Sequence, residues 1–180
     1  YFSSISNSWL EHASRYVAQM RDRFKLGAKN YVIEIASNDG YLLKNFVSLG
    51  IPCLGVEPTP DTADVAEAQG VPVLREFFCS DLGSRLAKEN KQADLVLGNN
   101  VYAHVPDIND FTVGLKKVLK SRGVVTLEFP HLLRLLEENQ FDTIYHEHFS
   151  YLSLHTVSRI FKQAGLKIWD VESLSTHGGS

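Results

Sequence analysis

The chain has 180 residues, 44% of them hydrophobic, and a formal net charge of −3, which suits one well-packed domain. No basic run exceeds two residues and no apolar stretch approaches the roughly 18 residues that span a membrane, so we expect neither nucleic acid nor a membrane as a partner. Two cysteines, Cys53 and Cys79, are too few for a disulfide framework or a four-cysteine zinc site, which favours a cytoplasmic protein.

Residues 1–27 predict an amino-terminal helix. Asn7 or Ser8 can cap it, Gly27 can stop it, and apolar residues recur between them at helical spacing. Among its aromatic residues, Trp9, Tyr16 and Phe24 are expected in the core.

Strands and helices then alternate along the chain. Short apolar runs predict strands, and segments of helical periodicity closed by Gly50, Gly70 or Gly165 predict helices. The predicted strands cover residues 31–36, 53–56, 71–74, 94–98, 124–129 and 166–171. The predicted helices cover residues 41–49, 62–69, 81–89, 108–119 and 156–164.

This alternation predicts an α/β fold of the Rossmann-like kind, with a mostly parallel, doubly wound sheet and helices on both faces. Ligands of such sheets bind at the carboxyl ends of the strands. Residues 130–153 interrupt the rhythm with a Leu-rich helix over 131–138 and an irregular polar and aromatic stretch. We expect this insertion to carry a lid or an active-site loop.

The turn after the first strand indicates which ligand binds. A dinucleotide fold needs three glycines there, whereas only Gly40 is present, and a pyrophosphate would face Glu34 and Asp39. S-adenosylmethionine fits better because it is cationic and carries no phosphate. Glu57, at the end of the second strand, can accept hydrogen bonds from both ribose hydroxyls.

Further residues at the ends of the first, second and fourth predicted strands complete the predicted cofactor site. Amide and backbone groups follow the fourth strand, and His104 lies at the same edge. The predicted contacts of S-adenosylmethionine are Glu34, Ala36, Asn38, Asp39, Gly40, Tyr41, Leu42, Glu57, Pro58, Asn99, Asn100, Val101 and His104. Glu128 ends the fifth strand and could be either a cofactor contact or a structural acid.

Four segments resemble the sugar C-methyltransferases, which act on nucleotide-linked 4-keto-deoxysugars. They are VIEIASNDGYLL (32–43), GVEP (55–58), GNNVYAHVPD (98–107) and EENQFDTIYHEHFSYLS (137–153), and the last is the most specific. The resemblance implies a class I methyltransferase that methylates C3 of the sugar, beside the C4 ketone. Family members also have an amino-terminal zinc domain and a carboxy-terminal domain that holds the sugar nucleotide. We therefore expect a fragment of a longer protein, with zinc only in the first of those domains.

The Tyr-His-Glu-His segment supplies groups for that chemistry. A base must remove the proton beside the ketone, and histidine is the usual base at neutral pH. By analogy with the family, His148 is the predicted base, while Tyr145 and Glu147 orient it or contact the sugar and the enolate. His104, at the cofactor edge of the fold, is expected near the methionine portion of the cofactor or near the reacting carbon. In a regular strand Tyr145 and His148 would point to opposite faces, so their cooperation requires a turn or a bulge.

Other interpretations are open at this point. His146 and His148 could form half of a metal site with Glu147, His131 or His104, or the segment could be an exposed polar loop without chemistry. The acceptor atom could be oxygen or nitrogen on another small molecule, and the domain could bind S-adenosylmethionine without catalysing a reaction.

Overall fold

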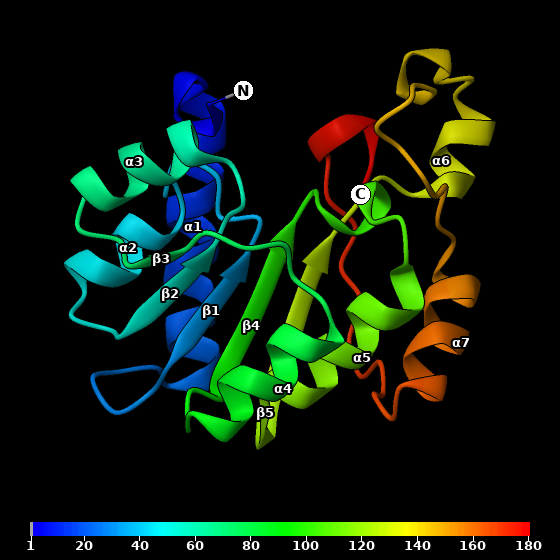
Figure 1. Ribbon diagram of the computed structural model, residues 1–180. Helices are drawn as coiled ribbons and strands as arrows, with labels where there is room; N and C mark the ends of the chain where they lie inside the picture. Colours follow the sequence, from blue (N-terminus) through cyan, green and yellow to red (C-terminus); the bar gives the residue numbers. More distant parts are fainter. Residues whose placement is uncertain (1) are drawn as a thin grey trace.

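A computed structural model describes residues 2–180, apart from the side chain of His177 (Figure 1). Five strands form one sheet in the order β3-β2-β1-β4-β5, and every neighbouring pair is parallel. The strands are β1 (Val32–Ile35), β2 (Cys53–Val56), β3 (Val73–Leu74), β4 (Ala93–Asn99) and β5 (Leu119–Glu128). The predicted parallel α/β sheet is therefore confirmed.

Helices connect and cover these strands. The α-helices are α1 (Asn7–Phe24), α2 (Leu43–Ser48), α3 (Pro60–Ala68), α4 (Ser80–Lys88), α5 (Ile108–Val118), α6 (Leu132–Glu137) and α7 (Leu154–Gln163). Short 3-10 turns are η1 (Ser3–Ile5), η2 (Tyr102–His104), η3 (Phe141–Thr143) and η4 (Thr176–Gly178). The predicted helix boundaries agree to within a few residues, but α1 is capped by Ser6 and ends at Lys25, before Gly27.

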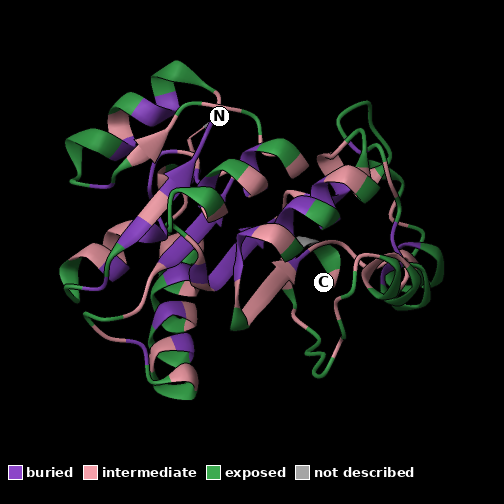
Figure 2. Cartoon of the chain, turned by 60° about the horizontal axis from the view of Figure 1, so that its bottom comes forward, coloured by how far each residue is buried: buried purple, intermediate pink, exposed green. Residues whose placement is uncertain are grey.

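Two hydrophobic cores lie on opposite faces of the sheet. Val32 and Leu95 face a core formed with α1, α2 and α3, whereas Ile33 and Val96 face a core formed with α4, α5 and α7. The alternation follows from the two-residue period of a strand, and it explains why the central strands are buried on both sides. Figure 2 shows this burial along the strands, with exposed residues on the outer helix faces.

The strand order decides where a ligand can bind. After β1 the chain moves outward through β2 and β3, then crosses back to place β4 on the other side of β1. This reversal opens a crevice between the carboxyl ends of β1 and β4, which is the usual ligand position in such sheets. The turns that follow these strands are therefore the first candidates for a site.

The prediction of a sixth strand over residues 166–171 is wrong. This segment forms no strand, and β5 is the edge of the sheet. A cavity of about 850 Å³ lies between β5, α1 and residues 165–175, so the segment is not close enough to pair with β5. The segment is held by side chains instead. Arg23 of α1 forms an ion pair with Asp170 and lies 4.6 Å from the centre of the Trp169 ring.

The turn after β1 has an unusual backbone. Ala36, Asn38 and Gly40 have φ angles of 56°, 51° and 76°, so every second residue is left-handed. The amides of Ala36 and Ser37 both donate to the carbonyl of Val56 on β2. A Cβ on Gly40 would lie 3.0 Å from the Cβ of Ala66, so the turn and α3 approach as closely as glycine permits.

Replacing Gly40 with alanine should destabilise the protein by about 2 kcal/mol or more, because the new methyl group meets α3 and the left-handed backbone is strained. Gly50→Ala is the matched control, since Gly50 also has a positive φ but has open space around it. It should cost only about 1 kcal/mol. Urea unfolding measures both, and equal losses would contradict close packing at Gly40.

Candidate active site

Three carboxylates meet at the carboxyl ends of β1 and β2. Glu34 is 1% exposed, Asp39 is fully buried and Glu57 is 5% exposed. Burial, and then the nearby charges of Asp39 and Glu57, raise the pKa of Glu34 well above its usual value. A buried group of like charges favours a cation at this place.

Glu57 is fixed by the backbone on both sides. Its Oε2 accepts a hydrogen bond from the amide of Asn38 at 3.0 Å, and its Oε1 accepts one from the amide of Thr59 at 2.9 Å. A carboxylate oxygen can accept two hydrogen bonds, so each oxygen keeps capacity for one further donor. This geometry leaves room for the predicted contact with the two neighbouring hydroxyls of a ribose.

Several buried polar atoms at this edge lack a partner among the described residues. A buried polar group without a hydrogen bond costs free energy and calls for a ligand or water. The atoms are Glu34 Oε2, Ser37 Oγ, Asp39 Oδ1, Asn99 Nδ2 and Asn100 Oδ1. They come from β1, the turn after it and the end of β4, so the residues present fit a cofactor that is cationic and rich in hydrogen-bonding groups.

Other predicted cofactor residues differ in what they can offer. Leu42 is fully buried in the core, so only its backbone could face a ligand. Tyr41 is 3% exposed, and its ring stacks on Trp9 with 6.0 Å between the ring centres. Asn100 has a φ of 54°, and its amide donates to the Glu128 carbonyl. Val101 packs against the core beside η2.

The segment before α1 also contacts the turn, which the sequence did not suggest. The amide of Ser3 donates to Asn38 Oδ1 at 2.9 Å, and the amide of Ser4 donates to Asp39 Oδ2 at 3.0 Å. These residues are 35 positions apart, and serines in an amino-terminal segment carry no signal for such a contact. The contacts fix two predicted cofactor residues from outside the sheet.

The Tyr-His-Glu-His segment forms the turn that its predicted chemistry required. The amide of His148 donates to the Tyr145 carbonyl, so both side chains can point the same way. His148 Nδ1 lies 2.7 Å from the Thr143 carbonyl, and the Tyr145 hydroxyl lies 3.0 Å from His148 Nε2. Since a carbonyl only accepts, Nδ1 carries the proton, and in the neutral ring Nε2 is the acceptor.

A second contact joins this insertion to the end of β4. The ring of His104 on η2 lies edge-to-face on His148, with 4.7 Å between their centres. The amide of Ser150 donates to the Ala103 carbonyl at 3.1 Å. His148 is 8% exposed and Tyr145 is 42% exposed, so the pair lies at a surface that a substrate can reach.

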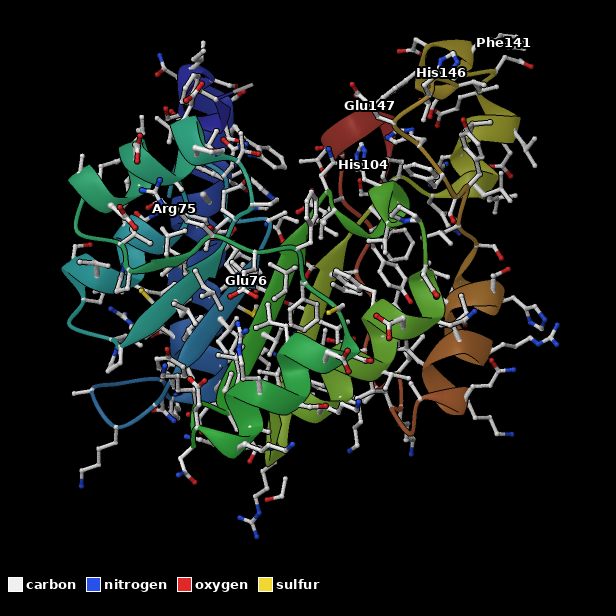
Figure 3. All side chains as sticks on the ribbon, in the orientation of Figure 1. Arg75, Glu76, His104, Phe141, His146 and Glu147 are labelled. Atoms are coloured by element: carbon white, nitrogen blue, oxygen red, sulfur yellow. The ribbon has the colours of Figure 1, made fainter. Side chains whose placement is uncertain are left out.

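The other titratable groups named for a metal site do not gather around one point. Figure 3 shows His104 near the strand ends, Glu147 above it, and His146 farther out with Phe141. His131 is a neighbour of Leu152 in an isolated bridge. Among the described residues, no three His, Cys, Asp or Glu side chains gather as a metal site would require. The structure therefore does not assemble the ligand set that the metal hypothesis named.

Glu128 is used for structure. Its Oε2 lies 2.8 Å from His12 Nε2 on α1, and its Oε1 accepts a hydrogen bond from the Thr176 hydroxyl. His12 and Glu128 are 116 residues apart, so no local pattern could have paired them. The sequence left Glu128 as either a cofactor contact or a structural acid, and these contacts agree with the structural acid.

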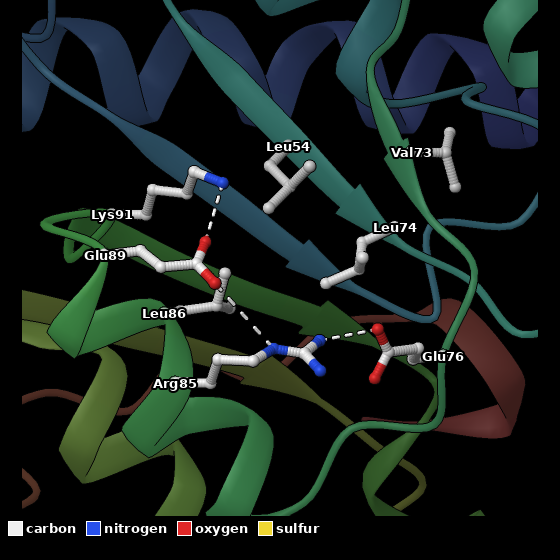
Figure 4. Close-up of a pocket in the computed structure, with 8 residues that line it drawn as sticks. All are labelled: Leu54, Val73, Leu74, Glu76, Arg85, Leu86, Glu89 and Lys91. Carbon is white, nitrogen blue, oxygen red and sulfur yellow. Dashed lines mark hydrogen bonds and ion pairs between the residues drawn. The ribbon is translucent and has the colours of Figure 1, made fainter.

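A smaller cavity lies away from these groups. It measures about 500 Å³ beside β3 and has an apolar floor of Leu54, Leu74 and Leu86 (Figure 4). Ion pairs of Arg85 and Lys91 with neighbouring glutamates form its rim. None of its lining residues is a predicted site residue, so the chemistry is assigned to the crevice at the strand ends. In the part of the chain that the structure describes, no helix is long and apolar enough to cross a membrane.

Comparison with known proteins identifies the domain. A profile of the methyltransferase domain family matches residues 9–171, almost the whole chain. The chain belongs to this family. Its predicted class, an S-adenosylmethionine-dependent methyltransferase, is confirmed, and so is the cofactor.

Individual relatives refine the comparison. The chain is 37% identical to the C-methyltransferase NovU of Streptomyces niveus over all 180 residues, but it spans only 43% of that protein. Its fold is similar to a magnesium protoporphyrin IX methyltransferase from Synechocystis with bound SAH (TM-score 0.71, 14% identity, 94% of this chain and 78% of that one). It is also similar to the YcgJ protein of Bacillus (TM-score 0.68, 17% identity, 91% and 72%).

Glu34→Gln should stabilise the ligand-free protein at neutral pH. The pKa of folded Glu34 is raised, so folding loses stability as pH rises above the unfolded pKa of about 4.3. The amide carries no charge and escapes this loss. We expect a gain on the order of 1 kcal/mol at pH 7 in urea unfolding.

The pH dependence supplies the control. Below about pH 4 both proteins are neutral at this position, so their stabilities should converge. A variant that is less stable than the wild type at pH 7, or a gain that persists unchanged at pH 3.5, would contradict the like-charge interpretation.

Proposed function

We propose that this domain C-methylates a carbon beside a ketone, namely C3 of a nucleotide-linked 4-keto-deoxysugar. The observation that carries the proposal is the tautomer of His148, whose Nδ1 is held by the Thr143 carbonyl and whose Nε2 is the acceptor beside Tyr145. A neutral imidazole whose Nε2 carries the lone pair can act as a general base once a substrate replaces Tyr145. The relative NovU is a C-methyltransferase, which supports the same choice of acceptor atom.

In this mechanism Nε2 of His148 exchanges its hydrogen bond with Tyr145 for contact with the C3–H of the sugar. In the ligand-free protein, the Tyr145 hydroxyl donates to Nε2. When the sugar binds, its C3–H takes that position, and Nε2 removes the proton as the electrons move into an enolate. The Thr143 carbonyl keeps Nδ1 oriented and stabilises the positive ring that results.

Tyr145 and Glu147 set the charge around the base. Burial, and then the charges of Glu147 and Tyr151, raise the pKa of Tyr145, so its phenol stays protonated and can donate. Glu147 lies in the same turn and offsets the positive charge of protonated His148. His104, in ring contact with His148, limits the space on its other side.

The cofactor is assigned to the crevice between β1 and β4. S-adenosylmethionine supplies an electrophilic methyl group on a sulfonium ion. Glu57 accepts its ribose hydroxyls, and the partnerless atoms of Asp39 and Asn99 offer an acceptor and a donor to its amino acid part. Gly40 and Ala36 let the backbone of the turn approach. The remaining predicted contacts, including Pro58, stay predictions.

Two other functions remain alternatives. An O- or N-methyltransferase would use the same cofactor site but would need no exchange of a carbon-bound proton. A binding domain would hold the cofactor without turnover. The added zinc and sugar-nucleotide domains, the sugar nucleotide itself and the cytoplasmic location also stay predictions, since the chain spans less than half of its curated relative.

Glu57→Gln tests the cofactor site. The amide removes the charge and turns one ribose acceptor into a donor, so the affinity for S-adenosylmethionine should fall about 10- to 100-fold. Isothermal titration measures it. Glu67→Gln on the exposed face of α3 is the matched control and should bind normally. Equal affinity of both variants would remove Glu57 from the site.

His148→Ala tests the base. In deuterated water, the wild-type full-length protein should exchange the C3 proton of a nucleotide-linked 4-keto-deoxysugar without any methyl donor. The variant should lose this exchange and methyl transfer by about 10²- to 10⁴-fold, while its affinity for S-adenosylmethionine stays unchanged. Proton NMR follows the exchange.

His155→Ala is the control for that experiment, because His155 is an exposed histidine on α7 outside the insertion. It should behave as the wild type does. Methyl transfer by the wild type without proton exchange would favour an oxygen or nitrogen acceptor. Exchange that survives in His148→Ala would show that another group is the base.

A further inference from the structure

An enolate needs a hydrogen-bond donor at its oxygen as well as a base at its carbon. Removing one such preorganised donor costs enzymes about 10²- to 10³-fold in rate. In the ligand-free protein the Tyr145 hydroxyl donates to Nε2 of the base, so it would have to lose this partner before it could donate to an enolate. The proposed function therefore leaves one chemical role at the site unfilled.

Tyr151 is a second tyrosine in ring contact with His148. Its ring stands perpendicular to the imidazole, at 85° and with 6.1 Å between the centres, whereas the Tyr145 ring is tilted by 34° at 4.2 Å. The two phenols thus contact the same imidazole with different ring orientations. Tyr151 is 37% exposed, so its hydroxyl can be reached by a substrate.

The backbone on both sides of Tyr151 is anchored. The amide of Ser150 donates to the Ala103 carbonyl on η2, next to His104. Leu152 is 3% exposed and pairs with His131 in an isolated bridge. A half-exposed aromatic residue between two such anchors has a set position, as a preorganised donor requires.

The Tyr151 hydroxyl makes no hydrogen bond with any residue that the structure describes. It can therefore donate to a substrate without first losing a partner, unlike Tyr145. The effect of Tyr151 on the pKa of Tyr145 agrees with two phenols that lie near each other.

We propose that Tyr151 is a further catalytic residue, whose hydroxyl donates a hydrogen bond to the C4 oxygen of the sugar as the enolate forms. This inference rests on the proposed function. The C3–H bond breaks and its proton moves to His148 Nε2, while the electron pair of that bond moves toward the C4 oxygen. The phenol keeps its proton and stabilises the negative charge.

Tyr151→Phe removes only the hydroxyl and keeps the ring contact with His148. In the full-length protein we expect kcat for methyl transfer, and the C3 proton exchange without methyl donor, to fall about 10²- to 10³-fold. KM for the sugar nucleotide and the affinity for S-adenosylmethionine should change less than threefold. A purely structural role would not separate kcat from these two binding measurements.

Tyr31→Phe is the matched control, because it removes a phenol before β1, at the opposite end of the strands, and should leave both rates unchanged. Tyr151→Phe that keeps wild-type exchange, while His148→Ala abolishes it, would overturn the inference and leave the proposed function standing. A wild-type protein that exchanges no C3 proton would overturn both. Loss of S-adenosylmethionine binding in Tyr151→Phe would show a structural role and also overturn the inference.

Discussion

Burial of Glu34 beside two other carboxylates is the constraint around which the ligand end of this sheet is arranged. Burial, and then the repulsion of Asp39 and Glu57, raise the pKa of Glu34. The fold tolerates this because Asp39 and Glu57 are fixed by backbone amides rather than by cationic side chains. The negative charge is therefore left for a ligand, and a methyl donor whose sulfonium and ammonium groups are cationic is the complement that it selects.

The arrangement at the ends of β1 and β2 could be predicted, because it depends on residues that are close together in the chain. The acids at the ends of β1 and β2, the single glycine of the turn and the parallel strand order all follow from apolar runs, spacing and residue type. Contacts between distant segments were not predictable. The docking of Ser3 and Ser4 on the turn, and the pairing of His12 with Glu128, depend on how α1 lies across the sheet.

The error at residues 166–171 has the same origin. The apolar alternation of this segment is typical of a strand, but a strand also needs a partner for its backbone. In the structure a cavity separates it from β5, and Trp169 and Asp170 contact Arg23 instead. The local sequence indicates that a segment could form a strand. Whether it does depends on a neighbouring strand with which its backbone can pair, and the local sequence does not specify that neighbour.

The insertion shows how a local turn can decide chemistry. Residue order alone left Tyr145 and His148 on opposite faces, and the hydrogen bond from the His148 amide to the Tyr145 carbonyl brings them together. The Thr143 carbonyl then fixes the tautomer, because it can only accept a proton from Nδ1. The predicted cofactor residues thus depend on the sheet, and the proposed base depends on this turn. The contacts of His104 and Ala103 with the insertion join these two parts of the chain at the end of β4.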